Sequence, residues 1–289
     1  MSRETGATLI ELLVATAIML AVSAAAVSLV TAATAQSPRW NDAADLHQRA
    51  RVAIDAITRH VAMAGGGVPV ASLQATFPAI EPRRRSSFVT SASAITIRHI
   101  MDTAAWTTLT ADLAPGAARA AIDLHSGCAA GVAACGFVER TDAVVLDGRG
   151  DWHLVIVEPA APALLTLSDG VPGRTATFAV GSALADVEET SLYFDRATGS
   201  LRQEGPGAGT FPVVDGVAAL DFEYFGDRLL PLPLASLTDG PLCGSGALAY
   251  DCDLQRIRTV RATLTIATTG PGARDLRLSA DVTLRRRIR

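Results

Sequence analysis

The chain begins with an uninterrupted apolar run that carries one carboxylate at its front edge. From Leu12 to Pro38 there is no charged side chain. That is longer than the roughly 20 apolar residues that a helix needs to cross a bilayer. Glu11 lies just before this stretch, and a charge within a membrane span is costly unless it has a partner. The sequence therefore predicts a single membrane helix in which Glu11 has a specific role.

Two common explanations of such a run are a cleaved secretory signal and a plain membrane anchor. Ala33-Thr34-Ala35 before Gln36 resembles a small-residue cleavage site. Against a secretory signal, the run exceeds the ~7–15 residues of a typical signal core, and Glu11 lies inside its front edge. Arg3 before the run and Arg39 after it allow an inside amino terminus and a body outside the cytoplasm.

The start of the chain resembles the class III signal of type IV prepilins, since residues 6–15 read GATLIELLVA. The resemblance implies that a prepilin peptidase cuts between Gly6 and Ala7 and methylates the new amine of Ala7. It also implies that Glu11 is the acid that acts in filament assembly. Most members of the family have Phe or Met after the cut, and this chain departs from them with Ala7.

Elementary physics fits that role for Glu11. Residues four apart share one face of a helix, so Glu11 lies over the Ala7 amine of its own chain or meets the amine of a neighbour. The freed amine is cationic at neutral pH, and a carboxylate at a helix N-terminus also gains from the helix dipole. A carboxylate that only reaches out of the membrane to water is the alternative.

Further along, three segments resemble those of PilW-type minor pilins and J-type pseudopilins: residues 49–65, residues 213–224 and residues 283–287. The resemblance implies an α+β, pilin-like fold with a long N-terminal α-helix packed on an antiparallel β-sheet. The expected parts are a leader at 1–6, a transmembrane assembly helix at 7–37, an amphipathic helix at 38–64 and a β-rich extracytoplasmic body at 65–289.

Residue patterns predict the same elements. Apolar residues recur at three- and four-residue steps along residues 41–64, which is typical of an amphipathic helix. Pro38 predicts a kink or a short break, and Gly65-Gly66-Gly67 predicts the helix end. The predicted strands, which include three hairpins, cover residues 94–100, 142–146 with 152–157, 191–194 with 200–203, 217–225, and 260–267 with 276–284.

Four cysteines form two local pairs, Cys128 with Cys135 and Cys243 with Cys252. An even number in an exported domain favours disulfides, each closing a loop rich in small residues. Zinc is the alternative, but these spacings are wider than zinc ligands usually have. Asp251 and Asp253 could bind Ca²⁺ with loop carbonyl groups, and a solvated acidic loop is the simpler interpretation.

No catalytic pattern stands out, so the predicted role is not enzymatic and needs no cofactor. The five histidines do not cluster, and His47 and His60 are expected on the solvated helix face. The net charge of −4 does not suggest a nucleic-acid protein. Arginines 83–85, and arginines 285–287 with Arg289, could contact DNA phosphates or could protect strand edges from aggregation, which we favour.

Three functions remain as expectations. The first is a minor pilin that primes or caps a type IV pilus, with the prepilin peptidase, other minor and major pilins, the inner-membrane assembly platform and membrane lipid as partners. The second is a minor pseudopilin of a type II secretion system. The third is a tip adhesin or DNA-uptake subunit. Each implies a single pass through the inner membrane, with the body outside the cytoplasm.

Overall fold

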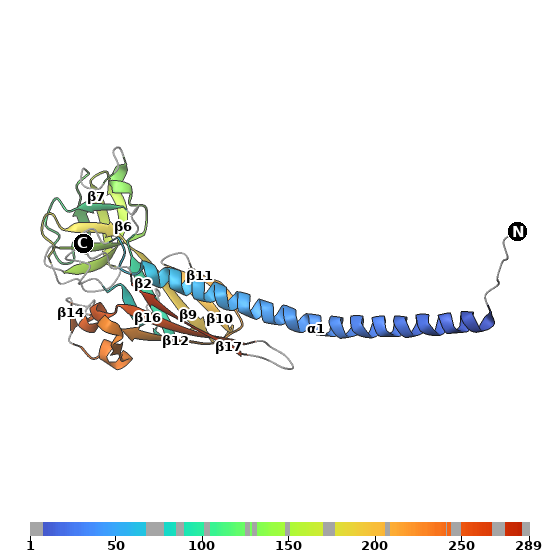
Figure 1. The fold of residues 1–289 in the computed structure, drawn as a ribbon. Helices are drawn as coiled ribbons and strands as arrows, with labels where there is room; N and C mark the ends of the chain where they lie inside the picture. Colours follow the sequence, from blue (N-terminus) through green and yellow to red (C-terminus); the bar gives the residue numbers. More distant parts are fainter. Residues whose placement is uncertain are drawn as a thin grey trace. The chain divides into compact units, whose positions relative to one another are not determined.

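The computed structural model describes residues 8–67, 78–84, 90–100, 105–124, 128, 132–147, 151–169, 177–205, 209–240, 242–243, 250–267 and 275–284. Within these, the side chains of residues 33–41, 84, 90, 168–169, 242–243 and 250 are not described. The chain divides into two compact units, Met1–Gln48 and Arg49–Arg289. The expected α+β fold is confirmed, with one long N-terminal helix followed by antiparallel sheets (Figure 1).

Helix α1 covers Leu9–Met63 and continues through Pro38 without a break. A proline removes one backbone hydrogen bond, and a helix this long can tolerate that loss where the chain on both sides favours helix. Within the second unit, the buried stripe consists of Ala50, Ala53, Ile57, Val61 and Ala64. The predicted amphipathic pattern is therefore confirmed, with one adjustment: Ala53, rather than Ile54, is fully buried.

The glycines after α1 turn the chain onto the sheet. The Gly65 N–H donates to the Arg98 carbonyl at 2.9 Å, and the Ile100 N–H donates to the Gly66 carbonyl at 2.9 Å. Gly67 has a φ of +74°, and a Cβ there would lie 1.6 Å from the Ile100 carbonyl oxygen. Only glycine fits so close to the neighbouring backbone, which explains why the helix ends at this triplet.

Two sheets build the base of the body. The first has the order β1-β2-β9-β10-β11, and the second has the order β13-β12-β16-β17. Strand β12 contacts both β2 and β9, which joins the two sheets. Their strands are β1 (Ile80–Arg84), β2 (Thr90–His99), β9 (Glu188–Asp195), β10 (Ser200–Gly205), β11 (Gly209–Asp215), β12 (Val217–Phe225), β13 (Pro231–Leu232), β16 (Thr259–Ala267) and β17 (Asp275–Thr283).

A third, six-stranded sheet lies between β2 and β9 in the sequence, in the order β3-β8-β5-β6-β7-β4. Its strands are β3 (Trp106–Thr108), β4 (Arg119–Ala121), β5 (Thr141–Leu146), β6 (Trp152–Ala161), β7 (Leu164–Asp169) and β8 (Ala183–Asp186). The Asp123 N–H donates to the Thr108 carbonyl and the Thr110 N–H to the Ala121 carbonyl, which joins the two ends of this sheet. It therefore closes into a small barrel, visible at the top of Figure 1.

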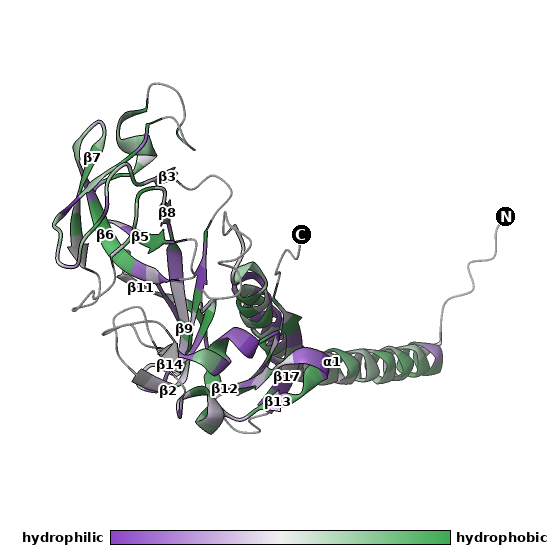
Figure 2. Ribbon diagram, turned by 90° about the vertical axis from the view of Figure 1, so that its left-hand side faces the viewer, coloured by the Kyte–Doolittle hydropathy of each residue, from purple (hydrophilic) through white to green (hydrophobic). Residues whose placement is uncertain are grey.

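The interior of the barrel is a packed apolar core. Side chains from several strands and from the loops fill it, among them Leu109, Phe137, Val155, Leu167 and Phe178, all at most 6% exposed. Barrels of so few strands have room for side chains but not for a ligand. In Figure 2 the strands β5 and β6 of this region are largely green, the colour of hydrophobic residues. The described part of the barrel thus has a packed apolar interior.

One of the remaining short elements lies within the barrel segment, and the others follow β12. They are the 3₁₀-helices η1 (Ala133–Gly136), η2 (Asp227–Leu229), η3 (Leu234–Leu237) and η5 (Cys252–Arg256), and the two-stranded pair β14 (Leu242–Cys243) and β15 (Tyr250–Asp251).

The three predicted hairpins are confirmed as antiparallel pairs: β5 with β6, β9 with β10, and β16 with β17. The predicted strand at 217–225 matches β12 residue for residue. The barrel itself was not predicted, because β3, β4 and β8 have only three or four residues each. Short strands of that kind carry little alternating pattern.

Candidate functional site

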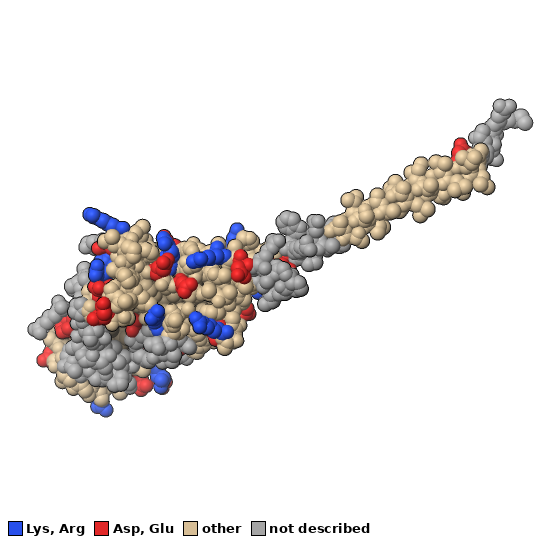
Figure 3. Space-filling view, turned by 90° about the horizontal axis from the view of Figure 1, so that it is seen from below, with Lys and Arg blue, Asp and Glu red and all other residues tan. Residues whose placement is uncertain are grey.

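The first unit presents an exposed apolar helix. Residues Leu9–Ala32 are long and apolar enough to cross a membrane, with a mean hydropathy of 2.4, and none of this segment is buried within the protein. Its large apolar side chains, from Leu9 to Val30, are 53–79% exposed. Figure 3 shows this stretch of α1 as an uncharged surface with one acidic side chain near its start. An apolar surface of this size fits a lipid or protein environment rather than water.

Glu11 caps the helix together with Thr8. The Glu11 carboxylate accepts hydrogen bonds from the Thr8 backbone N–H at 2.9 Å and from the Thr8 hydroxyl at 3.1 Å. In return, the Thr8 hydroxyl oxygen accepts from the Glu11 N–H at 3.3 Å. This reciprocal arrangement is a capping box, in which a Thr and a Glu three residues later satisfy the free donors of a helix start. Sequence reasoning did not single out Thr8, although the Thr-x-x-Glu spacing was visible.

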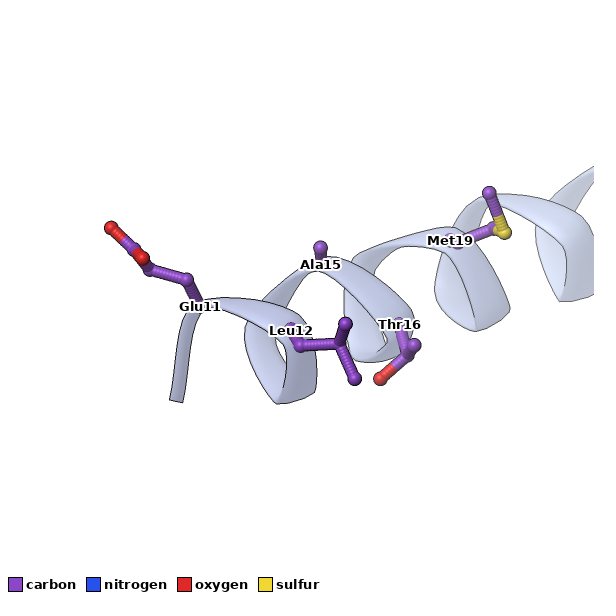
Figure 4. Close-up of a pocket in the computed structure, with 5 residues that line it drawn as sticks. All are labelled: Glu11, Leu12, Ala15, Thr16 and Met19. Carbon is purple, nitrogen blue, oxygen red and sulfur yellow. The ribbon is translucent and has the colours of Figure 1, made fainter. Parts of the chain in front are cut away.

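The capping box fixes where the carboxylate lies. Both bonds from Thr8 end on one oxygen, Oε2, so the other oxygen is available within the described part of the chain. Glu11 also lines a shallow groove on the helix with Leu12, Ala15, Thr16 and Met19, and Figure 4 shows these side chains along the first turns. Gly6 and Ala7, the predicted cleavage site, lie outside the described residues.

One predicted disulfide is present in the barrel. Cys128 and Cys135 are bonded, with their Cα atoms 4.6 Å apart. The bond holds the loop that contains Ala134 and Cys135, two residues with left-handed φ angles of 49° and 55°. Cys252 is also in a disulfide. The side chain of Cys243 is outside the described ones, so its pairing with Cys252 stays a prediction.

The other candidate residues have local partners. The buried Asp251 carboxylate accepts from the Gly240 N–H at 2.7 Å and from the Asp253 N–H at 2.8 Å, which caps η5. Asp253 pairs with Arg256 at 3.0 Å. Both carboxylates therefore have structural roles, and no group of metal-ligating side chains occurs among the described residues. In the first arginine cluster, Arg83 is exposed and Arg85 lies outside the described residues. The second cluster, within residues 285–289, also lies outside them.

The structure brings together a charged cluster that sequence reasoning missed. Arg98, on β2, is 1% exposed; its Nε donates to Glu189 at 2.6 Å and its Nη2 donates to Glu81 at 2.7 Å. Burial alone would lower the pKa of Arg98, but the two carboxylates outweigh burial and raise it above the ordinary value. Arg98 and Glu189 are direct cross-strand partners, so the ion pair joins the two strands between which the barrel is inserted.

Further titratable groups surround this ion pair. The pKa of Asp142, on β5, is raised to about 6 by burial first and then by the charges of Glu189 and Asp186. His99 lies 3.4 Å from Glu188, and burial lowers the pKa of this histidine. His60, which we expected on the solvated face of the helix, is half-buried and hydrogen-bonded to Gln203, and burial lowers its pKa as well.

The sequence matches no protein-family model and no curated protein.

Proposed function

We propose that the protein is a minor subunit of a type IV pilus, anchored by α1 in the inner membrane and non-enzymatic. The observation that carries the proposal is the start of α1, where an apolar, fully exposed segment holds a single acid at its first turn. A plain anchor needs no acid there, whereas a subunit that must dock beside others in a filament gains from a charge that fixes its register.

The capping box supports this role for Glu11. Thr8 holds the carboxylate at the helix start, and its Oε1 oxygen can accept a bond from a cationic group such as the amine of Ala7 in a neighbouring chain. Preorganising one partner reduces the entropy lost on docking. The size of the body also supports a minor rather than a major subunit. A body that carries an additional barrel fits a site at the tip more readily than a repeating site along the shaft.

Mass spectrometry of the amino terminus tests the first step. We expect protein isolated from membranes to begin at Ala7 with a methylated amine. A mature chain that begins at Gln36 would show a secretory signal instead and would end the proposal.

Substitution of Glu11 tests the second step. Glu11→Val should leave insertion and cleavage intact while it lowers the number of pili. Ser28→Ala is the matched control, because it removes only a hydroxyl that donates to the Ala25 carbonyl, in the same apolar segment but outside the groove beside Glu11. Normal piliation in the Glu11→Val strain would contradict the proposal. Loss of protein secretion with normal pili would assign the chain to a type II secretion system.

A further inference from the structure

The hairpin between β12 and β13, two strands labelled in Figure 2, ends in a strained turn. The Leu230 N–H donates to the Asp227 carbonyl at 3.2 Å, so Arg228 and Leu229 are the two central residues of the turn. Their φ angles are +57° and +56°. A hairpin turn with two positive φ angles strongly prefers Asn-Gly, because other side chains are strained in this conformation. Arg-Leu is therefore a poor sequence for forming this turn.

The same turn exposes apolar side chains. Leu229 is 57% exposed, Leu230 is 63% exposed, and Pro231 next to them is exposed as well. A single exposed leucine is common on protein surfaces, but turns are normally built from small polar residues. Backbone strain and exposed apolar surface thus coincide at one place. Strain of this kind is concentrated at sites that bind a ligand or a partner.

Contacts on both sides of the turn hold it in place. The Gly226 N–H donates to the Leu230 carbonyl at 2.8 Å, and the Arg258 guanidinium donates to the Asp227 carboxylate at 3.1 Å. Leu232, on β13, is only 6% exposed. A surface that is already held in one conformation loses less entropy when it binds. The turn therefore presents its exposed side chains in a preorganised form.

The chemistry of the turn favours a protein pocket as its partner. Arg228 is exposed and has no ion-pair partner in the part of the chain that the structure describes, so it is open to a carboxylate. Pro231 cannot donate a backbone hydrogen bond, which disfavours the addition of a further strand beside β13. Surfaces that bind membranes combine several basic residues with aromatic ones. Residues 227–231 contain one arginine, one aspartate and no aromatic residue, which does not fit a membrane surface.

We propose that residues 228–231 form a docking tip for a different protein, which receives Leu229 and Leu230 in an apolar pocket and pairs a carboxylate at the rim of that pocket with Arg228. The contact area of one turn is small, so we expect a reversible contact rather than a permanent one. Binding, rather than folding, then explains the residues at the centre of the turn. This inference does not rest on the proposed function, since it requires neither filament assembly nor cleavage after Gly6.

Photocrosslinking of the full-length chain in its own cells tests the contact. With Leu230 replaced by the photoreactive residue benzoylphenylalanine, we expect a crosslink to one other protein, which mass spectrometry identifies. The same probe at Arg196, which is exposed at the tip of the β9–β10 hairpin, is the matched control and should not give this product. Adding Arg228→Glu to the probe at position 230 should lower the yield about tenfold, because two acids then face each other. The crosslink supports the proposal only together with this loss.

A stability measurement separates binding from folding. Arg228→Asn combined with Leu229→Gly supplies the residues that this turn prefers, and it should raise the Tm of the full-length chain in detergent by about 3–6 °C. The same variant should bind the crosslinked protein at least about tenfold more weakly when both are purified. Val138→Asn, which removes an exposed apolar side chain of the barrel segment, is the matched control and should leave binding unchanged.

The proposal would be overturned by the absence of a protein product at position 230, by equal products at positions 196 and 230, or by a yield that Arg228→Glu does not change. A product with lipid would indicate a membrane contact instead, and a product with a second copy of the chain would indicate self-association; either would end the proposal. Unchanged binding by the variant with Asn and Gly would show that residues 228–231 are only a turn.

Discussion

The buried ion pair of Arg98 should control the stability of the body. Arg98→Met removes the cation and leaves the carboxylates of Glu189 and Glu81 without it, at side-chain exposures of 12% and 21%. Removing one member of a buried pair typically costs 3–5 kcal/mol. Because water reaches part of both carboxylates, we expect the lower end, about 3 kcal/mol. For a domain of this size that corresponds to a fall in Tm of about 6–12 °C.

Thermal unfolding of the full-length chain in detergent, followed by circular dichroism, measures this effect. Arg261→Met is the matched control, since it removes an arginine from a solvent-exposed pair with Asp281, where only a small change in Tm is expected. Adding Glu81→Gln and Glu189→Gln to Arg98→Met removes both negative charges and should recover most of the loss. A Tm for Arg98→Met within 2 °C of the parent at pH 7.5 would refute the reasoning.

Three further predictions use the same unfolding measurement. Gly67→Ala should lower the free energy of unfolding by at least about 2 kcal/mol, because the added Cβ would clash with the Ile100 carbonyl and the φ of residue 67 is positive. An unchanged Tm would contradict this. Cys128→Ala should lower the free energy of unfolding by about 2.5 kcal/mol, because it removes the bond to Cys135 that closes a short loop. Equal stability of the parent with and without reductant would contradict this. Asp142, with a pKa raised from 3.8 to about 6, destabilises the fold as the pH rises from about 4 to 6. Asp142→Asn should therefore stabilise by about 1–2 kcal/mol at pH 7.5 and by much less at pH 4.5.

Much of the base of the body could be predicted from residue patterns. The stripe that contains Ala50, Ile57 and Val61 has the period of a helix, and its residues are buried. The alternation in residues 260–267 and 276–284 predicted β16 and β17 because one side of each strand is more buried than the other. Local periodicity is decisive where an element is long and has one buried face.

Pairing between residues far apart in the sequence could not be predicted from local patterns. Arg98 and Glu189 are far apart in the sequence, and their contact depends on β2 and β9 being neighbours across the barrel. Nothing local in either strand identifies the other as its partner. At the start of α1, by contrast, the Thr8 cap could have been found, since its spacing to Glu11 is a local signature. The cleavage site at Gly6 and Ala7 remains a prediction.

The insertion of the barrel has a consequence for how the body folds. His99 and Glu188, where the chain leaves β2 and enters β9, are direct partners in the sheet, so both ends of the barrel segment meet at one point. Pairing these strands across an unfolded segment of residues 100–187 requires closing a long loop, which costs roughly 3 kcal/mol more than closing a tight turn. A barrel that folds first holds its own ends together and removes most of that cost. We therefore expect the barrel to form before β2 and β9 pair, so that it acts as a preassembled turn for the sheet below it.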